Sequence, residues 1–94
     1  MKNPQKIGSI LSSVLTQIGI IDDIRQERLF IDWDEIVGET VSKYAIPVKY
    51  EDEELWLKIE DPTWRTEIFN IRQILIEKIN KKLGEKAVRK IIIV

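Results

Sequence analysis

The chain has 94 residues, of which 44% are hydrophobic and 33% charged, and its net charge is −1. This length and composition predict one folded domain covering residues 1–94. Cysteine and histidine are absent, which excludes disulfides, thiolate metal sites and the commonest general base. We therefore expect no catalysis, no metal and no cofactor. The N-terminal sequence has no signal-peptide or membrane-spanning pattern, which indicates a cytoplasmic protein.

The charges are distributed unevenly along the chain. Residues 21–61 contain 5 basic and 13 acidic residues, whereas residues 62–94 contain 8 basic and 3 acidic residues. A uniformly basic chain would point directly to nucleic acid. Here only the C-terminal third can form a basic surface, and the acidic middle argues against a phosphate backbone wrapping the whole molecule.

Two helices are predicted in the first half of the chain. Apolar residues recur at steps of three and four over residues 5–20 and again over 23–44, which is the spacing of an amphipathic helix. Asp22 and Asp23 can cap the second helix, and Trp33 lies within its apolar stripe, which places it in the core. Gly38 interrupts this pattern and indicates either close backbone packing or the end of the regular helix.

Two strands follow, over residues 46–51 and 54–60. Pro47 blocks a helix, and apolar and polar residues alternate in both segments, as in half-buried strands. The acidic run Glu51-Asp52-Glu53-Glu54 separates them, so we expect a hairpin with an acidic loop.

A third helix is predicted over residues 62–83 and a last strand over 88–94. Asp61 can cap this helix ahead of Pro62, Trp64 lies on its apolar stripe, and Gly84 is a natural terminator. The β-branched C-terminal run suits a strand. The order α-α-β-β-α-β predicts an α+β fold in which helices pack on a three-stranded mixed sheet.

The basic residues of the C-terminal third have two interpretations. They can complement the helix dipole and protect an edge strand, or they can form a phosphate-contacting surface. The candidate nucleic-acid-binding residues are Arg65, Arg72, Lys78, Lys81, Lys82, Lys86, Arg89 and Lys90.

Trp56 is the second functional candidate. If Leu55, Leu57 and Ile59 face the core, Trp56 lies on the other face of the sheet with Lys49 and Lys58. An aromatic side chain beside lysines can stack on a base, or bind another protein or a second copy of the chain. The first helix could instead cover this face.

The chain resembles the DciA family of bacterial replicative-helicase loaders, also called domain of unknown function 721. The matching segments are Trp33-x-x-Ile36-Val37-Gly38-Glu39, Pro47 before the hairpin, Trp64-x-x-Glu67-Ile68, Ile79-Asn80-x-x-Leu83-Gly84 and the strand from Val88. Among these, Trp33, Gly38, Pro47, Trp64, Asn80 and Gly84 are interpreted as the structural framework.

The resemblance implies a KH-like fold of the second type and a role in loading the replicative DNA helicase at chromosome replication. It further implies binding of single-stranded or junction DNA, leaves RNA open, and allows a nucleoid-associated location. The sequence lacks the Gly-x-x-Gly loop with which KH domains clamp nucleic acid. The alternative is a protein-interaction or homodimerisation module that uses the sheet face around Trp56 and binds no nucleic acid.

Overall fold

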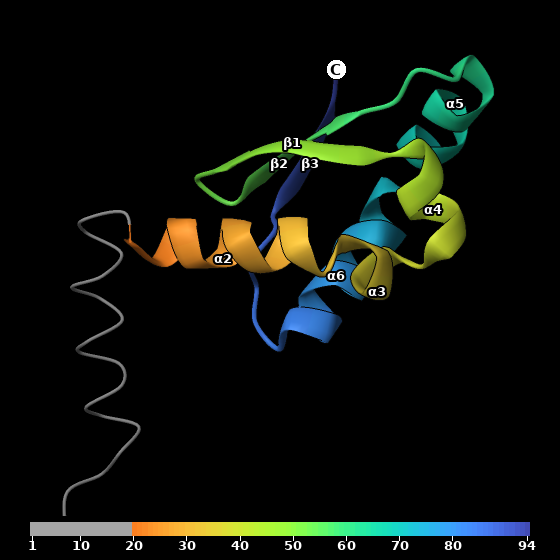
Figure 1. Ribbon diagram of the computed structural model, residues 1–94. Helices are drawn as coiled ribbons and strands as arrows, with labels where there is room; N and C mark the ends of the chain where they lie inside the picture. The colour runs from red at the N-terminus through yellow and green to blue at the C-terminus, as the bar shows by residue number, and fades with distance from the viewer. Residues whose placement is uncertain (1–19) are drawn as a thin grey trace, which may run out of the picture.

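The computed structural model describes residues 20–94, and the elements carry the labels of Figure 1. They are, in chain order, α2 (Ile20–Ile31), α3 (Trp33–Val37), α4 (Glu39–Tyr44), β1 (Ile46–Glu51), β2 (Glu54–Lys58), α5 (Pro62–Asn70), α6 (Arg72–Leu83) and β3 (Lys90–Ile93). No helix among them is long and apolar enough to cross a membrane. The predicted helix over residues 5–20 lies outside the described residues except for Ile20.

The three strands form one mixed sheet in the order β1-β2-β3. β1 and β2 are antiparallel, with a bulge between Pro47 and Lys49, and β2 pairs with β3 in parallel. Parallel neighbours need a crossover connection, and α5 with α6 supplies it. The predicted α+β fold with a three-stranded mixed sheet is confirmed.

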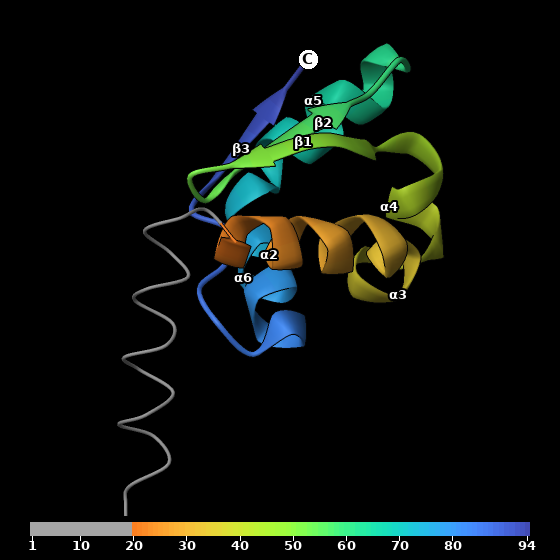
Figure 2. The same cartoon turned by 60° about the vertical axis from the view of Figure 1, so that its left-hand side comes forward.

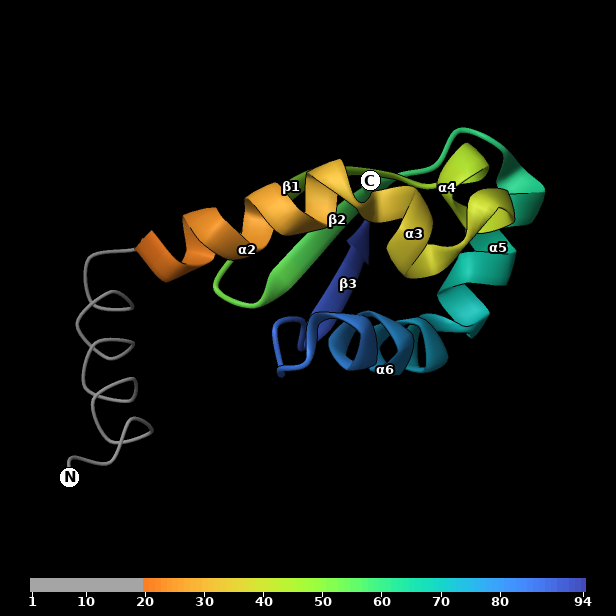
Figure 3. The same ribbon diagram turned by 60° about the horizontal axis from the view of Figure 1, so that its bottom comes forward.

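The hydrophobic core lies between one face of the sheet and the helices. α2, α3 and α6 lie on the same side of the sheet (Figures 1 and 3). Leu55, Leu57 and Ile59 of β2 and its extension are at most 1% exposed, so they face these helices. The remaining core side chains come mainly from the helices and from β3, and include Leu29, Trp33, Ile36, Val37, Ile68, Leu75, Ile79, Leu83 and Ile91.

The continuous helix predicted over residues 23–44 is wrong, because this segment forms α2, α3 and α4. Asp32 lies between the first two helices with φ −100° and ψ 19°, and Gly38 lies between the last two with φ 94° and ψ 158°. The latter torsions belong to a region that is essentially restricted to glycine. α2 also begins at Ile20, so Asp22 and Asp23 lie in its first turn, where they complement the helix dipole and do not serve as the N-cap.

The continuous helix predicted over residues 62–83 is also wrong. Ile71 separates α5 from α6 with φ −102° and ψ 15°, a sparsely populated bridge conformation. The amide of Ile71 still donates to Glu67 O over 3.1 Å, and its carbonyl accepts from Leu75 N over 2.9 Å. The axis therefore bends while the helical hydrogen bonds continue. The two later strands are shorter than predicted, ending at Lys58 and beginning at Lys90.

Candidate nucleic-acid interface

A groove of about 510 Å³ lies between the α5–α6 pair and the edge strand β3. β3 is the edge strand farthest from β1, and Figure 2 shows the sheet above α2 and α3. The groove is lined by two sets of residues, Arg65, Thr66, Phe69 and Arg72 from the helices and Lys90, Ile91, Ile92 and Ile93 from the strand. The lining thus combines apolar side chains with three cationic ones.

Among residues 20–94, the charged side chains that line this groove are all cationic. They are Arg65, Arg72 and Lys90, and the other lining residues are neutral. A smaller cavity of about 220 Å³ continues it, sharing Phe69 and Arg72 and adding Arg89, and no carboxylate of the described residues lines it. Because the chain as a whole contains 16 acidic and 15 basic residues, this local separation of charge favours an anionic ligand.

Phe69 is the functional candidate that the sequence interpretation missed. Its ring is 52% exposed, and the guanidinium carbon of Arg72 lies 3.7 Å from the ring centroid. Arg65, Phe69 and Arg72 follow one another at steps of four and three, and all three line the groove although Arg72 lies beyond the bend at Ile71. That spacing was the signal in the sequence by which Phe69 could have been identified. The three residues lie one position away from the buried stripe that contains Ile68.

Arg65 holds the groove together as well as lining it. Its Nη1 donates to the carbonyl oxygen of Ile59 over 3.0 Å and to that of Val94 over 2.8 Å. One guanidinium therefore joins α5 to the ends of both β2 and β3. These two hydrogen bonds join the α5 side of the groove, which carries Phe69, to the strand side.

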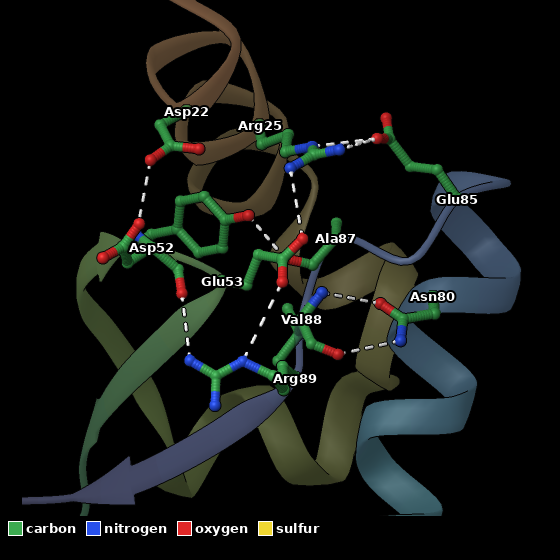
Figure 4. A network of polar contacts seen from close by, with 10 residues as sticks. Asp22, Arg25, Asp52, Glu53, Asn80, Glu85, Ala87, Val88 and Arg89 are labelled. Carbon is green, nitrogen blue, oxygen red and sulfur yellow. Dashed lines mark hydrogen bonds and ion pairs between the residues drawn. The ribbon is translucent and has the colours of Figure 1, made fainter. Parts of the chain in front are cut away.

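The turn between α6 and β3 is fixed by Asn80. Its side-chain amide donates to Val88 O over 2.9 Å and accepts from Val88 N over 2.8 Å (Figure 4). The next residue, Arg89, pairs with the hairpin carboxylates of Glu54 at 3.4 Å and Glu53 at 3.9 Å. These contacts set the direction in which β3 starts and so place Lys90 in the lining of the groove.

Tyr50 and Arg25 support the same turn from β1 and α2. The Tyr50 hydroxyl donates to the carbonyl oxygen of Ala87, and Arg25 Nη2 pairs with Glu85 at 2.6 Å (Figure 4). Burial raises the pKa of the Tyr50 phenol, although the neighbouring Arg25 opposes this change. The phenol is therefore neutral at ordinary pH and remains a hydrogen-bond donor.

The structure does not bring all the predicted basic residues together. Lys78 reaches the carbonyl oxygen of Val37 over 3.3 Å, on the α3 side of α6. Lys81 and Lys82 lie in the last turn of α6, about 14 Å along the axis from Arg72 at 1.5 Å per residue. Lys86 lines a third cavity, which shares Gln73, Ile76 and Arg89 with the smaller one and is also lined by Glu53 and Glu77.

Trp56 lies next to Lys49 on the sheet. Lys49 Nζ is 4.6 Å from the centroid of the indole, and the two residues are cross-strand partners. Lys58 is exposed and pairs with Glu60 at 3.6 Å. The predicted neighbourhood of Trp56 and Lys49 is thus present in the sheet, while its role remains a prediction.

The framework residues occupy structural positions. Trp33 is buried and its indole N–H donates to Ala45 O over 2.7 Å, while Trp64 stacks on Tyr44 with ring centroids 4.6 Å apart. Asp61 caps α5 by accepting from the amides of Thr63 and Trp64. Gly84 ends α6 in the left-handed conformation with φ 74°, and Pro47 lies at the β1 bulge.

Comparison with known proteins gives consistent matches along nearly the whole chain. The family model described as "Dna[CI] antecedent, DciA" matches residues 6–93. A UPF0232 protein of Streptomyces coelicolor is 27% identical over 96% of this chain and 48% of its own length. A UPF0232 protein of Streptomyces avermitilis is 26% identical, covering 94% of this chain and 50% of the relative. The chain thus spans about half the length of the curated relatives it matches.

Proposed function

The chain belongs to the DciA family, and from this premise we propose that it is a non-catalytic module that binds single-stranded or junction DNA and takes part in loading the replicative DNA helicase. It acts without turnover in the cytoplasm, at the nucleoid. Membership of the family supports the role in helicase loading. The groove between α5–α6 and β3 supports DNA as the ligand.

The observation that carries the proposal is the combination of cations and an exposed ring in one groove. Arg72 and Lys90 can neutralise phosphates and release their counterions. Phe69, 52% exposed beside them, offers a face on which a base can stack. Bases that stack on a protein ring must be unpaired. The groove therefore suits a single strand better than a duplex.

The absence of a glycine clamp limits the affinity. The glycines of the described part of the chain are Gly38 and Gly84, and neither lines the groove. Close backbone approach to phosphates, which a glycine-rich loop provides, therefore does not contribute here. Affinity must come from side-chain cations and stacking, so we expect weak binding that depends strongly on salt.

A salt titration tests the DNA-binding part. A fluorescein-labelled oligothymidylate is titrated with the protein by fluorescence anisotropy over a series of salt concentrations. With three to four phosphate contacts, the logarithm of the binding constant should fall with that of salt concentration with a slope of about −2 to −3 for single strands. A duplex of equal length should bind more weakly. Undetectable binding at low salt contradicts the proposal, and an oligouridylate titration separates DNA from RNA.

The helicase part needs its own measurement. The purified chain, immobilised, is presented with the replicative helicase of the same cell, with and without oligothymidylate. We expect retention of the helicase, and an immobilised chain with Arg72→Glu shows whether this contact needs the groove. No retention in either condition would remove the helicase role and leave the DNA binding to stand alone.

A further inference from the structure

Ile92 belongs to two surfaces at once. It lines the groove between β3 and the helices, and in the parallel register of the sheet it is the partner of Trp56 on β2. Side chains of paired residues project from the same face of a sheet, and neighbouring strands lie about 4.8 Å apart. Ile92 therefore connects the groove to the sheet face that carries Trp56.

This sheet face is the one opposite the core. Helices α2, α3 and α6 lie on the other side of the strands (Figures 1 and 3), where Leu55 and Leu57 are buried. Trp56 alternates with these residues along β2. Across the sheet its ring is flanked by Lys49, at 4.6 Å, and by Ile92.

We propose that a single strand held in the groove continues over Ile92 and stacks a further base on Trp56, with Lys49 beside the adjoining phosphate. This inference rests on the proposed nucleic-acid binding and extends its footprint from the edge of the sheet to the outer sheet face. Phe69 and Trp56 then form two stacking platforms on either side of Ile92, with Lys90 and Lys49 contacting the backbone.

Two carboxylates lie near this path. Glu54, the register partner of Lys90, already pairs with Arg89 at 3.4 Å. Lys49 pairs with Glu51 at 3.1 Å, and both side chains are more than half exposed. Exposed ion pairs of this kind contribute little and are screened by salt, so a phosphate can replace the carboxylate as the partner of Lys49. Their presence does reduce the electrostatic gain on this face. Stacking on Trp56, and not charge, should dominate there.

The test compares two probe lengths. Oligothymidylates of about four nucleotides and of about ten, near the lower end and in the middle of the range of single-strand site sizes, are titrated with the same variants. In the wild-type protein the longer probe should bind more tightly. Trp56→Ala should weaken the longer probe at least fivefold, about 1 kcal/mol at 1.4 kcal/mol per factor of ten, and the shorter probe less than twofold.

Matched variants separate the two platforms. Phe69→Ala should weaken both probes, Trp56→Phe should retain most of the affinity for the longer probe, and Ile74→Ala, which removes an exposed side chain on α6, should change neither. Because Trp56 stacking is not ionic, the salt slope of Trp56→Ala should equal that of the wild type.

Three outcomes overturn the inference in recognisably different ways. If Trp56→Ala leaves the longer probe unaffected while Phe69→Ala weakens both, the groove binds DNA but the sheet face does not. If neither probe binds at low salt, the proposed function itself fails. If sedimentation shows a dimer that Trp56→Ala dissociates, the face is occupied by a second copy of the chain.

Discussion

Asn80 and Val88 are joined by two hydrogen bonds, in which the side-chain amide of Asn80 bonds both the N–H and the carbonyl oxygen of Val88. The amide thus bonds both backbone groups of Val88, as a neighbouring strand would. It fixes the chain between α6 and β3 just before Arg89 and Lys90. This explains why an asparagine in the third turn of α6 belongs with the framework and not with the ligand-binding residues.

Asn80→Ala should lower the free energy of unfolding by about 1–3 kcal/mol, because two partly buried backbone groups lose their partner. Asn80→Asp should cost more, since its carboxylate faces the carbonyl oxygen of Val88. Urea denaturation followed by circular dichroism measures both. Asn70→Ala, at the exposed end of α5, is the matched control. Equal costs for Asn70→Ala and Asn80→Ala would show that the two bonds contribute nothing.

Gly38→Ala should destabilise the fold more than Gly84→Ala. At Gly38 a Cβ would meet only Lys78 Nζ at 3.7 Å, so the cost is conformational and about 1–3 kcal/mol in a region reserved for glycine. Gly84 has the left-handed torsions that other residues reach for about 1 kcal/mol. Chemical denaturation of both variants decides the order. Gly84→Asn should be tolerated better than Gly84→Ala.

The break at Gly38 confirms one of the two interpretations of that glycine, the end of the regular helix, and shows why periodicity alone could not predict the helix boundaries. Apolar residues keep helical spacing through Gly38 because all three short helices pack on one core. The torsion angles that redirect the chain leave no trace in that spacing. Ile71 is an even clearer case, because it is an apolar residue on the stripe and nothing in its spacing indicates the bridge conformation in which it joins α5 to α6.

The candidate site was predictable only in part. Alternation predicted that Trp56 and Lys49 share a sheet face, whereas the register that makes them cross-strand partners comes from the structure. The length of α6 determines which of the predicted basic residues reach the groove. Those at the start of α6 meet β3, while Lys81 and Lys82 lie at its other end. Phe69 was overlooked because it lies one position away from the apolar stripe of the core. An apolar residue at such a position is interpreted as part of the ordinary surface.

The hairpin loop offers a stabilising substitution. Asp52 and Glu53 both have positive φ, 55° and 64°, as a two-residue primed turn requires. Asn-Gly suits these torsions better, so the double variant Asp52→Asn, Glu53→Gly should raise the free energy of unfolding by about 1 kcal/mol. The backbone bond from Arg89 N to Glu53 O, 2.7 Å, would be kept. A decrease in urea midpoint would show that the Glu53 carboxylate matters more than the torsions.

Alkaline pH should destabilise the protein through Tyr50. Burial raises the pKa of its phenol in the folded state, above the ordinary value of about 10. The folded state then holds this proton more tightly than the unfolded state, so stability is complete below pH 10 and declines as pH rises beyond it. Tyr50→Phe cannot ionise. The difference in unfolding free energy between wild type and Tyr50→Phe should therefore shift in favour of the variant above pH 10, and a constant difference contradicts the argument.

Charge reversal distinguishes the groove from the rest of the basic surface. Lys90→Glu places a carboxylate in a groove lined by cations. It should therefore weaken oligothymidylate binding about tenfold or more. It should also reduce the salt slope by about 0.7 per lost phosphate contact. Lys82→Glu makes the same change of charge at the far end of α6 and should act only through long-range attraction, which salt at about 0.15 M screens beyond about 8 Å. Lys43→Glu on α4 is a second control with equal net charge. If Lys82→Glu and Lys90→Glu weaken binding equally at this salt concentration, the ligand follows the length of α6 and not the groove, because only a direct phosphate contact survives such screening.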